Sequence, residues 1–190
     1  MALASQNGEV RENALRQMVA GVDRTSRLVR QLLDLAAVEG AERAPHSAAA
    51  LSDILGRILA DMPAADERVV VETDDKAVAR FDLVLLTLAL RNLIENALFH
   101  SEGKVVVRVR EAGEHLEIVV EDDGPGIAAD DLPRVSERFF RGRTHSQTGS
   151  GLGLAIAQEA VARMAGTLAL RNCDPHGLAA TISLQAQRAS

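Results

Sequence analysis

The fold is decided by the stretch Leu116-Glu117-Ile118-Val119-Val120-Glu121-Asp122-Asp123-Gly124-Pro125-Gly126-Ile127. The apolar run at its start predicts a β-strand, and the Asp-Asp-Gly-Pro-Gly segment that follows must end that strand in a turn. Glycine lets the backbone turn sharply or approach another group closely. Taken alone, the segment leaves open whether it is an ordinary surface turn or one wall of a binding site.

The strand belongs to a predicted sheet. Valines at positions 105, 107 and 109 alternate with Lys104, Val106, Arg108 and Arg110, so residues 104–110 are expected to pair with residues 116–120 as a hairpin across Gly113. Further short strands are expected at residues 69–72, 167–171 and 178–184. After the turn, residues 130–139 predict a short helix.

Three longer helices are expected around the sheet. Residues 51–62 are amphipathic and stop at Pro63, and an apolar helix opens at Gly151 and should end with Gly166 in the C′ position. The helix at residues 81–100 is the most informative. Asn92, Asn96 and His100 recur every four residues beside its apolar stripe, which indicates either a ligand site or structural hydrogen bonds.

A second glycine cluster, Gly149-Ser150-Gly151-Leu152-Gly153-Leu154, opens the last of these helices. It is not a P-loop, because Gly153 is followed by Leu154 instead of the phosphate-binding lysine. Its glycine spacing also differs from that of the dinucleotide fingerprint. What remains is a polar loop, residues 141–150, that leads into a helix N-terminus, and such a terminus favours an anion such as phosphate.

The N-terminal part is organised differently. Apolar or small residues alternate three and four apart through residues 9–38, which predicts a long helix with a narrow buried stripe, either inside a helix bundle or at a dimer interface. Arg24, Arg27 and Arg30 are interpreted as its solvated face. Residues 41–50 are expected to form a linker, which divides the chain into a helical segment at 1–40 and a globular domain at 51–190.

Composition excludes several functions. The 190 residues carry 21 Lys and Arg against 27 Asp and Glu, a net charge of −6, and aromatic residues are only 2%. An acidic chain poor in aromatics suits neither backbone binding nor base stacking, so no nucleic-acid partner is expected. Cys173 is the single cysteine, so no internal disulfide can form. No apolar run approaches the ~20 residues of a membrane span, and the chain is expected to be soluble.

Four motifs in order resemble the ATP-binding catalytic domain of two-component sensor histidine kinases, within the gyrase, Hsp90, histidine kinase and MutL group. They are Asn92-Leu93-Ile94-Glu95-Asn96-Ala97, Asp122-Asp123-Gly124-Pro125-Gly126, Glu137-Arg138-Phe139-Phe140-Arg141, and residues 149–154. The resemblance extends from about Ser47 to the C-terminus, and residues 15–38 resemble the second helix of the family's dimerisation and phosphotransfer domain. It implies an α/β two-layer sandwich of Bergerat type, a mixed sheet with three helices on one face, preceded by a long bundle helix.

The resemblance also implies roles for residues. Asn96 would hold the Mg²⁺ that bridges the ATP phosphates, Asn92 would position those phosphates, and Asp122 would accept a hydrogen bond from adenine N6. Residues 139–151 would form a lid from which Arg141 reaches the γ-phosphate. The residues implied to bind nucleotide are Asn92, Asn96, His100, Asp122, Gly124, Gly126, Ile127, Gly149, Ser150, Gly151, Leu152, Gly153 and Leu154.

The chain departs from the family pattern at three points. Hydrolysing members place a Glu base where this chain has Asn92, which argues against hydrolysis. Phe99 stands where a Lys or Arg is often found, so Arg141, Arg143 and Mg²⁺ are expected to meet the phosphate charge. None of the five histidines is followed by an acidic residue, so the phosphoacceptor helix is expected to lie outside this sequence.

The expected function is therefore that of a sensor histidine kinase fragment. It would bind Mg-ATP and transfer the γ-phosphoryl group to a histidine on that acceptor helix, for relay to a response regulator, without labelling itself. The resemblance further implies a homodimer and the cytoplasmic part of an inner-membrane sensor. Two alternatives stay open: an ATPase of the same fold, and a non-catalytic dimerisation or partner-binding module with a vestigial pocket.

Overall fold

The computed structural model describes residues 2–40, 47–62, 65, 67–73, 78–112, 115–140, 142 and 150–185. Its centre is a five-stranded sheet in the order β2-β4-β5-β7-β6. The strands are β2 (Val69–Thr73), β4 (Val105–Ala112), β5 (His115–Glu121), β6 (Thr167–Asn172) and β7 (Leu178–Gln185). Strand β2 runs parallel to β4, and the other neighbouring pairs of this sheet are antiparallel, so the sheet is mixed.

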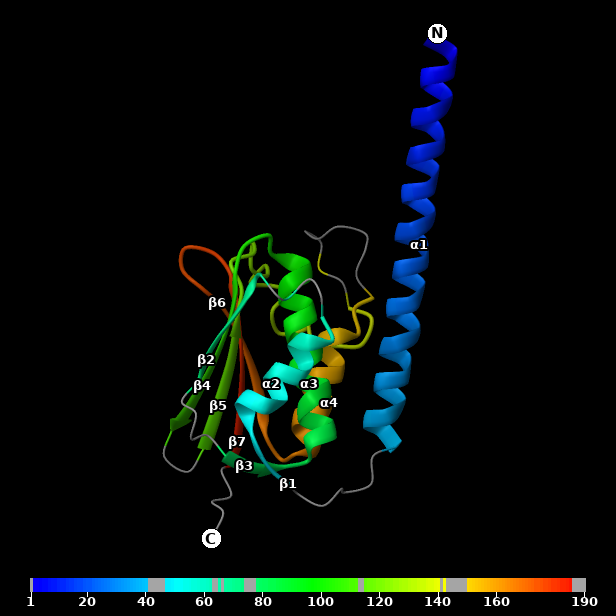
Figure 1. Cartoon of the computed structure of the whole chain (residues 1–190). Helices are drawn as coiled ribbons and strands as arrows, with labels where there is room; N and C mark the ends of the chain where they lie inside the picture. The colour runs from blue at the N-terminus through cyan, green and yellow to red at the C-terminus, as the bar shows by residue number, and fades with distance from the viewer. Residues whose placement is uncertain are drawn as a thin grey trace.

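Three helices cover one face of this sheet: α2 (Leu51–Ala60), α3 (Leu83–His100) and α4 (Gly153–Arg163) (Figure 1). Successive residues of a strand point to opposite faces, so alternate apolar side chains meet these helices. The buried residues of β4 and β5 are Val105, Val107, Val109, Leu116, Ile118 and Val120. Burying each large aliphatic side chain contributes about 1.5–3 kcal/mol. The expected two-layer α/β sandwich is therefore confirmed.

Helix α3 is the central helix of this layer. Its N-terminus is capped by Asp82, whose Oδ1 accepts hydrogen bonds from the N–H groups of Val84 (3.0 Å) and Leu85 (3.1 Å). By length and composition α3 is the one helix of the described chain that could cross a membrane. Its apolar residues Leu86 and Leu90 are fully buried, however, as in the core helix of a globular domain.

Two short strands were not expected. Strand β1 (Ser47–Ala50) pairs antiparallel with β3 (Val78–Phe81). The sequence predicted a linker through the first of these segments, because four small residues show no strand periodicity and only tertiary pairing orders them. Residues 41–46 lie outside the described residues, and the division of the chain at 40 and 50 stays a prediction.

The prediction of a short helix at residues 130–139 is wrong. The segment forms successive turns, in which Asp131 N–H donates to Ala128 O (2.9 Å), Arg134 N–H to Asp131 O (3.0 Å) and Glu137 N–H to Arg134 O (2.8 Å). Bonds that span three residues belong to turns, and Pro133 has no N–H with which to continue a helical ladder. The described residues 128–140 therefore form turns instead of a helix.

The end of α4 also differs in detail. The residue in the left-handed region is Ala165, with φ of 56°, instead of Gly166. Gly166 has another reason to be glycine, because a Cβ there would lie 2.8 Å from the carbonyl oxygen of Ser183 on β7. This close approach seats the end of the helix on the sheet.

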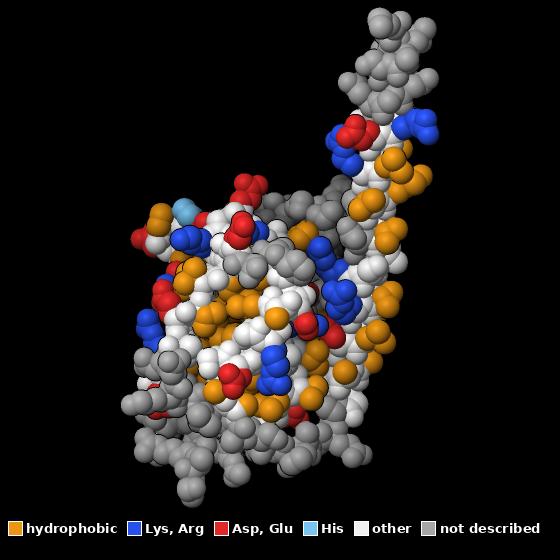
Figure 2. Space-filling model, viewed as in Figure 1, with side chains coloured by type: hydrophobic (Ala, Val, Ile, Leu, Met, Phe, Trp, Pro, Cys, Tyr) orange, Lys and Arg blue, Asp and Glu red, His pale blue; other side chains and the backbone are white. Residues whose placement is uncertain are grey.

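The long helix α1 (Ala2–Gly40) is confirmed and lies beside the sandwich (Figure 1). Its last turns pack on the domain, where Val38 is fully buried and Leu35 nearly so. Further up, the predicted apolar stripe remains exposed, and Figure 2 shows it as a row of side chains along the edge of α1 that faces away from the sandwich. Exposed residues of this row are Leu15, Met18, Val22, Val29 and Leu32.

Candidate functional site

A cavity of about 460 Å³ opens between α1, α3, the turn after β5 and the start of α4. Its volume is in the range of small-molecule binding sites. Ten of the residues expected to bind nucleotide line it, namely Asn92, Asn96, His100, Asp122, Gly126, Ile127, Ser150, Gly151, Gly153 and Leu154. Segments far apart in the sequence thus meet at one hollow.

Two other expected residues, Leu152 and Gly124, are placed differently. Leu152 is fully buried in the core, and only its N–H reaches toward the site, by donating to Ser150 Oγ at 3.1 Å. Gly124 lies behind the cavity wall, where a Cβ would be 2.7 Å from His100 O. Arg141 and Gly149 lie outside the described residues, as do Arg143 and most of the expected lid.

Asp122 is the carboxylate at the end of β5. Its Oδ1 accepts hydrogen bonds from the N–H groups of Gly124 (2.8 Å) and Leu178 (3.3 Å), which leaves Oδ2 as the oxygen that can accept from a ligand. Burial raises the pKa of Asp122, and the same two N–H groups act in the opposite direction. A buried carboxylate fixed in this way is suited to bind an exocyclic amine.

The turn after Asp122 is held by Asn172, which the sequence analysis missed. Asn172 Oδ1 accepts from Ile127 N–H (2.8 Å), and its Nδ2 donates to Ile127 O (2.7 Å). Gly126 has φ of 72°, and a Cβ there would lie 2.8 Å from Asn172 Oδ1. The side chain at the end of β6 therefore sets the position of the cavity wall formed by residues 126 and 127.

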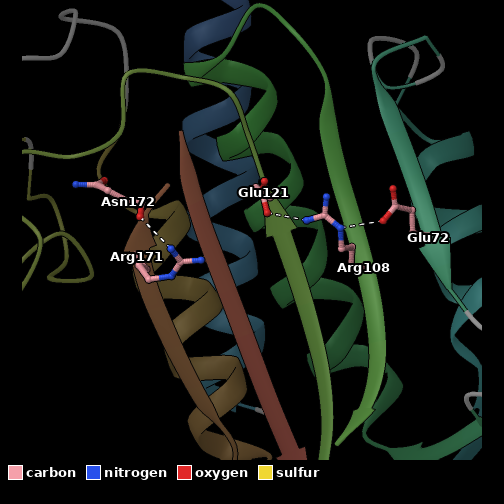
Figure 3. A network of polar contacts seen from close by, with 5 residues as sticks. All are labelled: Glu72, Arg108, Glu121, Arg171 and Asn172. Atoms are coloured by element: carbon pink, nitrogen blue, oxygen red, sulfur yellow. Dashed lines mark hydrogen bonds and ion pairs between the residues drawn. The ribbon is translucent and has the colours of Figure 1, made fainter. Parts of the chain in front are cut away.

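An ion-pair network braces the strands that lead to this wall (Figure 3). Arg108 on β4 donates to Glu72 on β2 (2.8 Å) and to Glu121 on β5 (2.6 Å). The hydrogen bond to Glu121 is the main cause that raises the pKa of Arg108. Because these side chains are partly exposed, each pair contributes at most about 1 kcal/mol. Their structural effect is to fix Glu121, the residue before Asp122.

Asn92 carries an unusual buried atom. The side chain is 2% exposed, and its Nδ2 donates to Leu88 O at 2.9 Å. Its Oδ1 has no hydrogen-bond partner in the described part of the chain. Leaving such an oxygen unpaired costs about 1–3 kcal/mol, so the atom points to a ligand. Asn96 lies one helical turn further and lines the same cavity.

These amides fit a magnesium ion. Mg²⁺ prefers oxygen ligands, keeps several waters and takes few groups from the protein. Among the described residues no three His, Cys, Asp or Glu side chains gather as a metal cluster, so a cation in this cavity would depend on amide oxygens and on phosphate. The unpaired Asn92 Oδ1 satisfies that requirement from the protein side.

The end of α3 is secured by Arg68, a second residue that the sequence analysis missed. Its guanidinium donates to the carbonyl oxygens of Leu98 (3.2 Å), Ser101 (2.6 Å) and Gly103 (2.9 Å). The last carbonyls of a helix have no partner within the helix, and an arginine can satisfy them. Arg68 thereby fixes the turn that carries His100 into the cavity.

The start of α4 forms the opposite wall. Gly151 has φ of 70°, and a Cβ there would lie 2.6 Å from Phe140 O, so only glycine fits. Its carbonyl accepts from Phe139 N–H at 2.9 Å. The first N–H groups of α4 are not needed by the helix and lie at the cavity, where the helix dipole favours an anion.

Helix α1 closes the cavity on its remaining side, which the sequence did not predict. Ser150 Oγ donates to Gln31 Oε1 at 2.5 Å. Arg27 and Arg30 line the cavity, and the Arg27 guanidinium lies 5.0 Å from the ring centroid of Phe99. The interpretation of Arg27 as part of a solvated face is therefore wrong, because α1 packs on the domain at that level and leaves this side chain only partly exposed. Arg30 lines the cavity but is exposed as expected, and the Arg24 side chain lies outside the described residues.

The chain resembles known proteins in sequence along most of its length. Residues 81–188 match the family of histidine kinase-, DNA gyrase B-, and HSP90-like ATPases. The sensor-like histidine kinase SenX3 of Mycobacterium tuberculosis is 33% identical over 98% of this chain and 48% of its own length. The sensor protein QseC of Escherichia coli K12 is 31% identical over 95% of this chain and 41% of its own. This chain thus spans about half the length of these relatives or less.

Solved structures agree with the sequence matches. The mycobacterial sensor histidine kinase MprB is 30% identical, superposes with a TM-score of 0.66, and covers 76% of this chain and 99% of its own. Full-length ShkA, solved in complex with AMPPNP, is 25% identical with a TM-score of 0.72 over 86% of this chain and 36% of its own.

Proposed function

This chain belongs to the histidine kinase-, DNA gyrase B- and HSP90-like ATPases and, among them, to the sensor histidine kinases, and from this we propose that it binds Mg-ATP as the catalytic part of such a kinase. The observation that carries the proposal is the convergence at one cavity of the Asp122 carboxylate, the unpaired Asn92 Oδ1 and the N-terminus of α4. The Asp122 carboxylate suits a purine amine, and the Asn92 oxygen suits a metal-bridged phosphate chain. The N-terminus of α4 suits phosphate oxygens.

Each feature takes one part of the nucleotide. Asp122 Oδ2 would accept from adenine N6 while Gly126 and Ile127 wall the base. Asn96 would hold Mg²⁺, and the unpaired Asn92 Oδ1, which can only accept, would position the phosphates through that ion and its waters. The ion would neutralise charge on the phosphates. The N–H groups at Gly151 and Gly153 would donate to phosphate oxygens. Arg141 would reach the γ-phosphate from the lid.

We propose phosphoryl transfer to a histidine in place of hydrolysis. Phosphoryl transfer needs mainly positioning and charge neutralisation, and the acceptor supplies the nucleophile. An ATPase needs a base near its attacking water, but position 92 carries an amide, which cannot accept a proton at neutral pH. The acceptor would be a histidine on another helix of the kinase, and a response-regulator aspartate would receive the group afterwards.

The exposed apolar row on α1 supports dimerisation. A helix with such a row buries it against other helices, as in the four-helix bundles that two kinase chains form. Within the proposed kinase, this chain would be the cytoplasmic part of a membrane-anchored sensor.

Calorimetric titration tests the nucleotide site directly. The chain should bind ATP in Mg²⁺ buffer and lose most of that affinity when EDTA replaces Mg²⁺. Radiolabelled phosphate should then pass from ATP to an added phosphoacceptor-helix protein, while the chain alone releases little free phosphate. Absence of heat at millimolar nucleotide would show a vestigial pocket, and sustained phosphate release without acceptor would show an ATPase.

A further inference from the structure

Among the residues that the structure describes, the charges that line the cavity suit a triphosphate only if α1 takes part. Three carboxylates line it, Asp61, Glu95 and Asp122, together with three arginines, Arg27, Arg30 and Arg68. Arg68 is already occupied by the carbonyl oxygens at the end of α3. The other two cations both belong to α1. Among the described residues, the ATPase-like domain therefore offers no uncommitted Arg or Lys of its own to this cavity.

The two α1 arginines differ in their surroundings. Arg30 lowers the pKa of both Asp34 and Glu95, whereas Arg27 acts only on Glu95 and lowers its pKa less than Arg30 does. Arg27 forms no ion pair with any residue that the structure describes. Its guanidinium lies over the Phe99 ring on α3, and that ring also meets His100 edge-on, with centroids 4.9 Å apart. Arg27 is thus a positioned cation with its hydrogen-bond donors available.

Helix α1 is held against the ATPase-like domain by contacts on the C-terminal side of Arg27. Gln31 accepts from Ser150 at the start of α4, one turn after Arg27. Near the end of α1, Glu39 forms an ion pair with Arg138 (2.8 Å), and its carbonyl accepts from Arg163 (2.9 Å). Val38 is fully buried between these contacts. Such contacts order the helix on the domain before any ligand arrives.

We propose that Arg27 of α1 binds the phosphate groups of the nucleotide and that Phe99 holds its guanidinium in place for that role. This inference rests on the proposed nucleotide binding and deepens it, because it makes the site a joint product of α1 and the ATPase-like domain. An aromatic face orients a guanidinium while leaving its edge N–H groups free to donate, and a guanidinium can bind phosphate through two parallel N–H groups. The position of α1 and the affinity for phosphates are then coupled, since each stabilises the other.

The test compares ATP with adenosine in the intact chain. Arg27→Gln should weaken ATP binding about tenfold, because one charge-assisted hydrogen bond at a partly exposed site is lost. Adenosine has no phosphate, so its affinity should change less than twofold. Arg16→Gln is the matched control, because Arg16 is on the same helix, exposed, and paired with Glu12 away from the cavity. This control should bind both ligands like the parent chain.

A second variant tests the position of the charge. Adding Phe99→Lys to Arg27→Gln puts a cation on α3 at the same side of the cavity and should restore most of the ATP affinity. Equal ATP affinity in Arg27→Gln and the parent, with adenosine binding intact, would overturn the role of Arg27 and leave the proposed function standing. Parallel losses for ATP and adenosine would also overturn it, by showing a structural role. A parent chain that binds neither ligand would refute both proposals.

Discussion

Asn172 holds the backbone of Ile127 by two hydrogen bonds, one accepted from its N–H (2.8 Å) and one donated to its carbonyl (2.7 Å). We expect Asn172→Ala to lower ADP affinity about fivefold, because the wall beside the base is no longer fixed, and to lower the unfolding free energy by about 1 kcal/mol. Calorimetry and thermal unfolding measure the two effects. Asn172→Asp keeps only the acceptor for Ile127 N–H and should fall between the parent and the alanine variant; unchanged ADP affinity in all three would contradict this role.

Asp122 is expected to select adenine. In Asp122→Asn the side-chain oxygen can still accept from Gly124 and Leu178, so the fold should persist. The atom that faces the ligand then becomes an amide that can donate, so ADP affinity should fall about tenfold and the preference for ADP over GDP should shrink. Competition of both nucleotides against a fluorescent ADP analogue measures the preference. A variant that keeps the parent's discrimination would show that other atoms recognise the base.

The residues found from the sequence are those whose spacing is local. Asn92 and Asn96 stand on one helix face because four residues make about one turn, and Asp122 follows directly from the end of its strand. The missed residues act across long separations. Asn172 and Ile127 are 45 residues apart, and Ser150 and Gln31 are 119 apart.

The correct and the incorrect predictions of helices and strands have the same physical origin. Periodicity located α2, α3, α4 and the five central strands, because each has a continuous apolar face. It missed β1, whose four residues, Ser47–Ala50, are ordered only by pairing with β3. It also placed Arg27 in solvent, because the pattern of one helix does not show which neighbour packs against it.

The unpaired Asn92 Oδ1 leads to the prediction that a substitution at this position changes stability little but removes ATP binding. Asn92→Leu removes a buried acceptor that has no partner among the described residues, together with the amide's hydrogen bonds to Leu88 O and to the Asp34 carboxylate. These effects oppose each other, so we expect the unfolding free energy to change by less than about 1 kcal/mol. Mg-dependent ATP binding should be lost. Denaturant unfolding measures the stability, and calorimetry measures the ATP affinity. Leu88→Ala is a control on the same helix, away from the cavity lining. A large loss of stability with intact ATP binding would make Asn92 a structural residue.

Asn96→Ala should act on the metal alone. Asn96 lines the cavity one turn beyond Asn92 and is only partly buried, so its removal should leave the melting temperature nearly unchanged. ATP affinity measured with Mg²⁺ should fall to the level that the parent chain shows in EDTA. In EDTA the variant and the parent should bind alike, and a variant that still gains affinity on adding Mg²⁺ would exclude Asn96 as the metal ligand.

Packing of α1 on the domain should depend on pH through Asp34. Burial raises the pKa of this carboxyl, while Arg91, Asn92 and Arg30 oppose the shift. A carboxyl with a higher pKa in the packed state than in the released state binds more protons when packed. Packing should therefore strengthen as pH falls from neutral through this raised pKa, and the gain should end below the ordinary value near 3.8.

Energy transfer between labels on α1 and α4 measures the packing, in a Cys173→Ser background. Asp34→Asn should reduce the pH dependence, although Glu95, whose pKa burial also raises, would keep part of it; an unchanged pH profile in Asp34→Asn would refute the assignment.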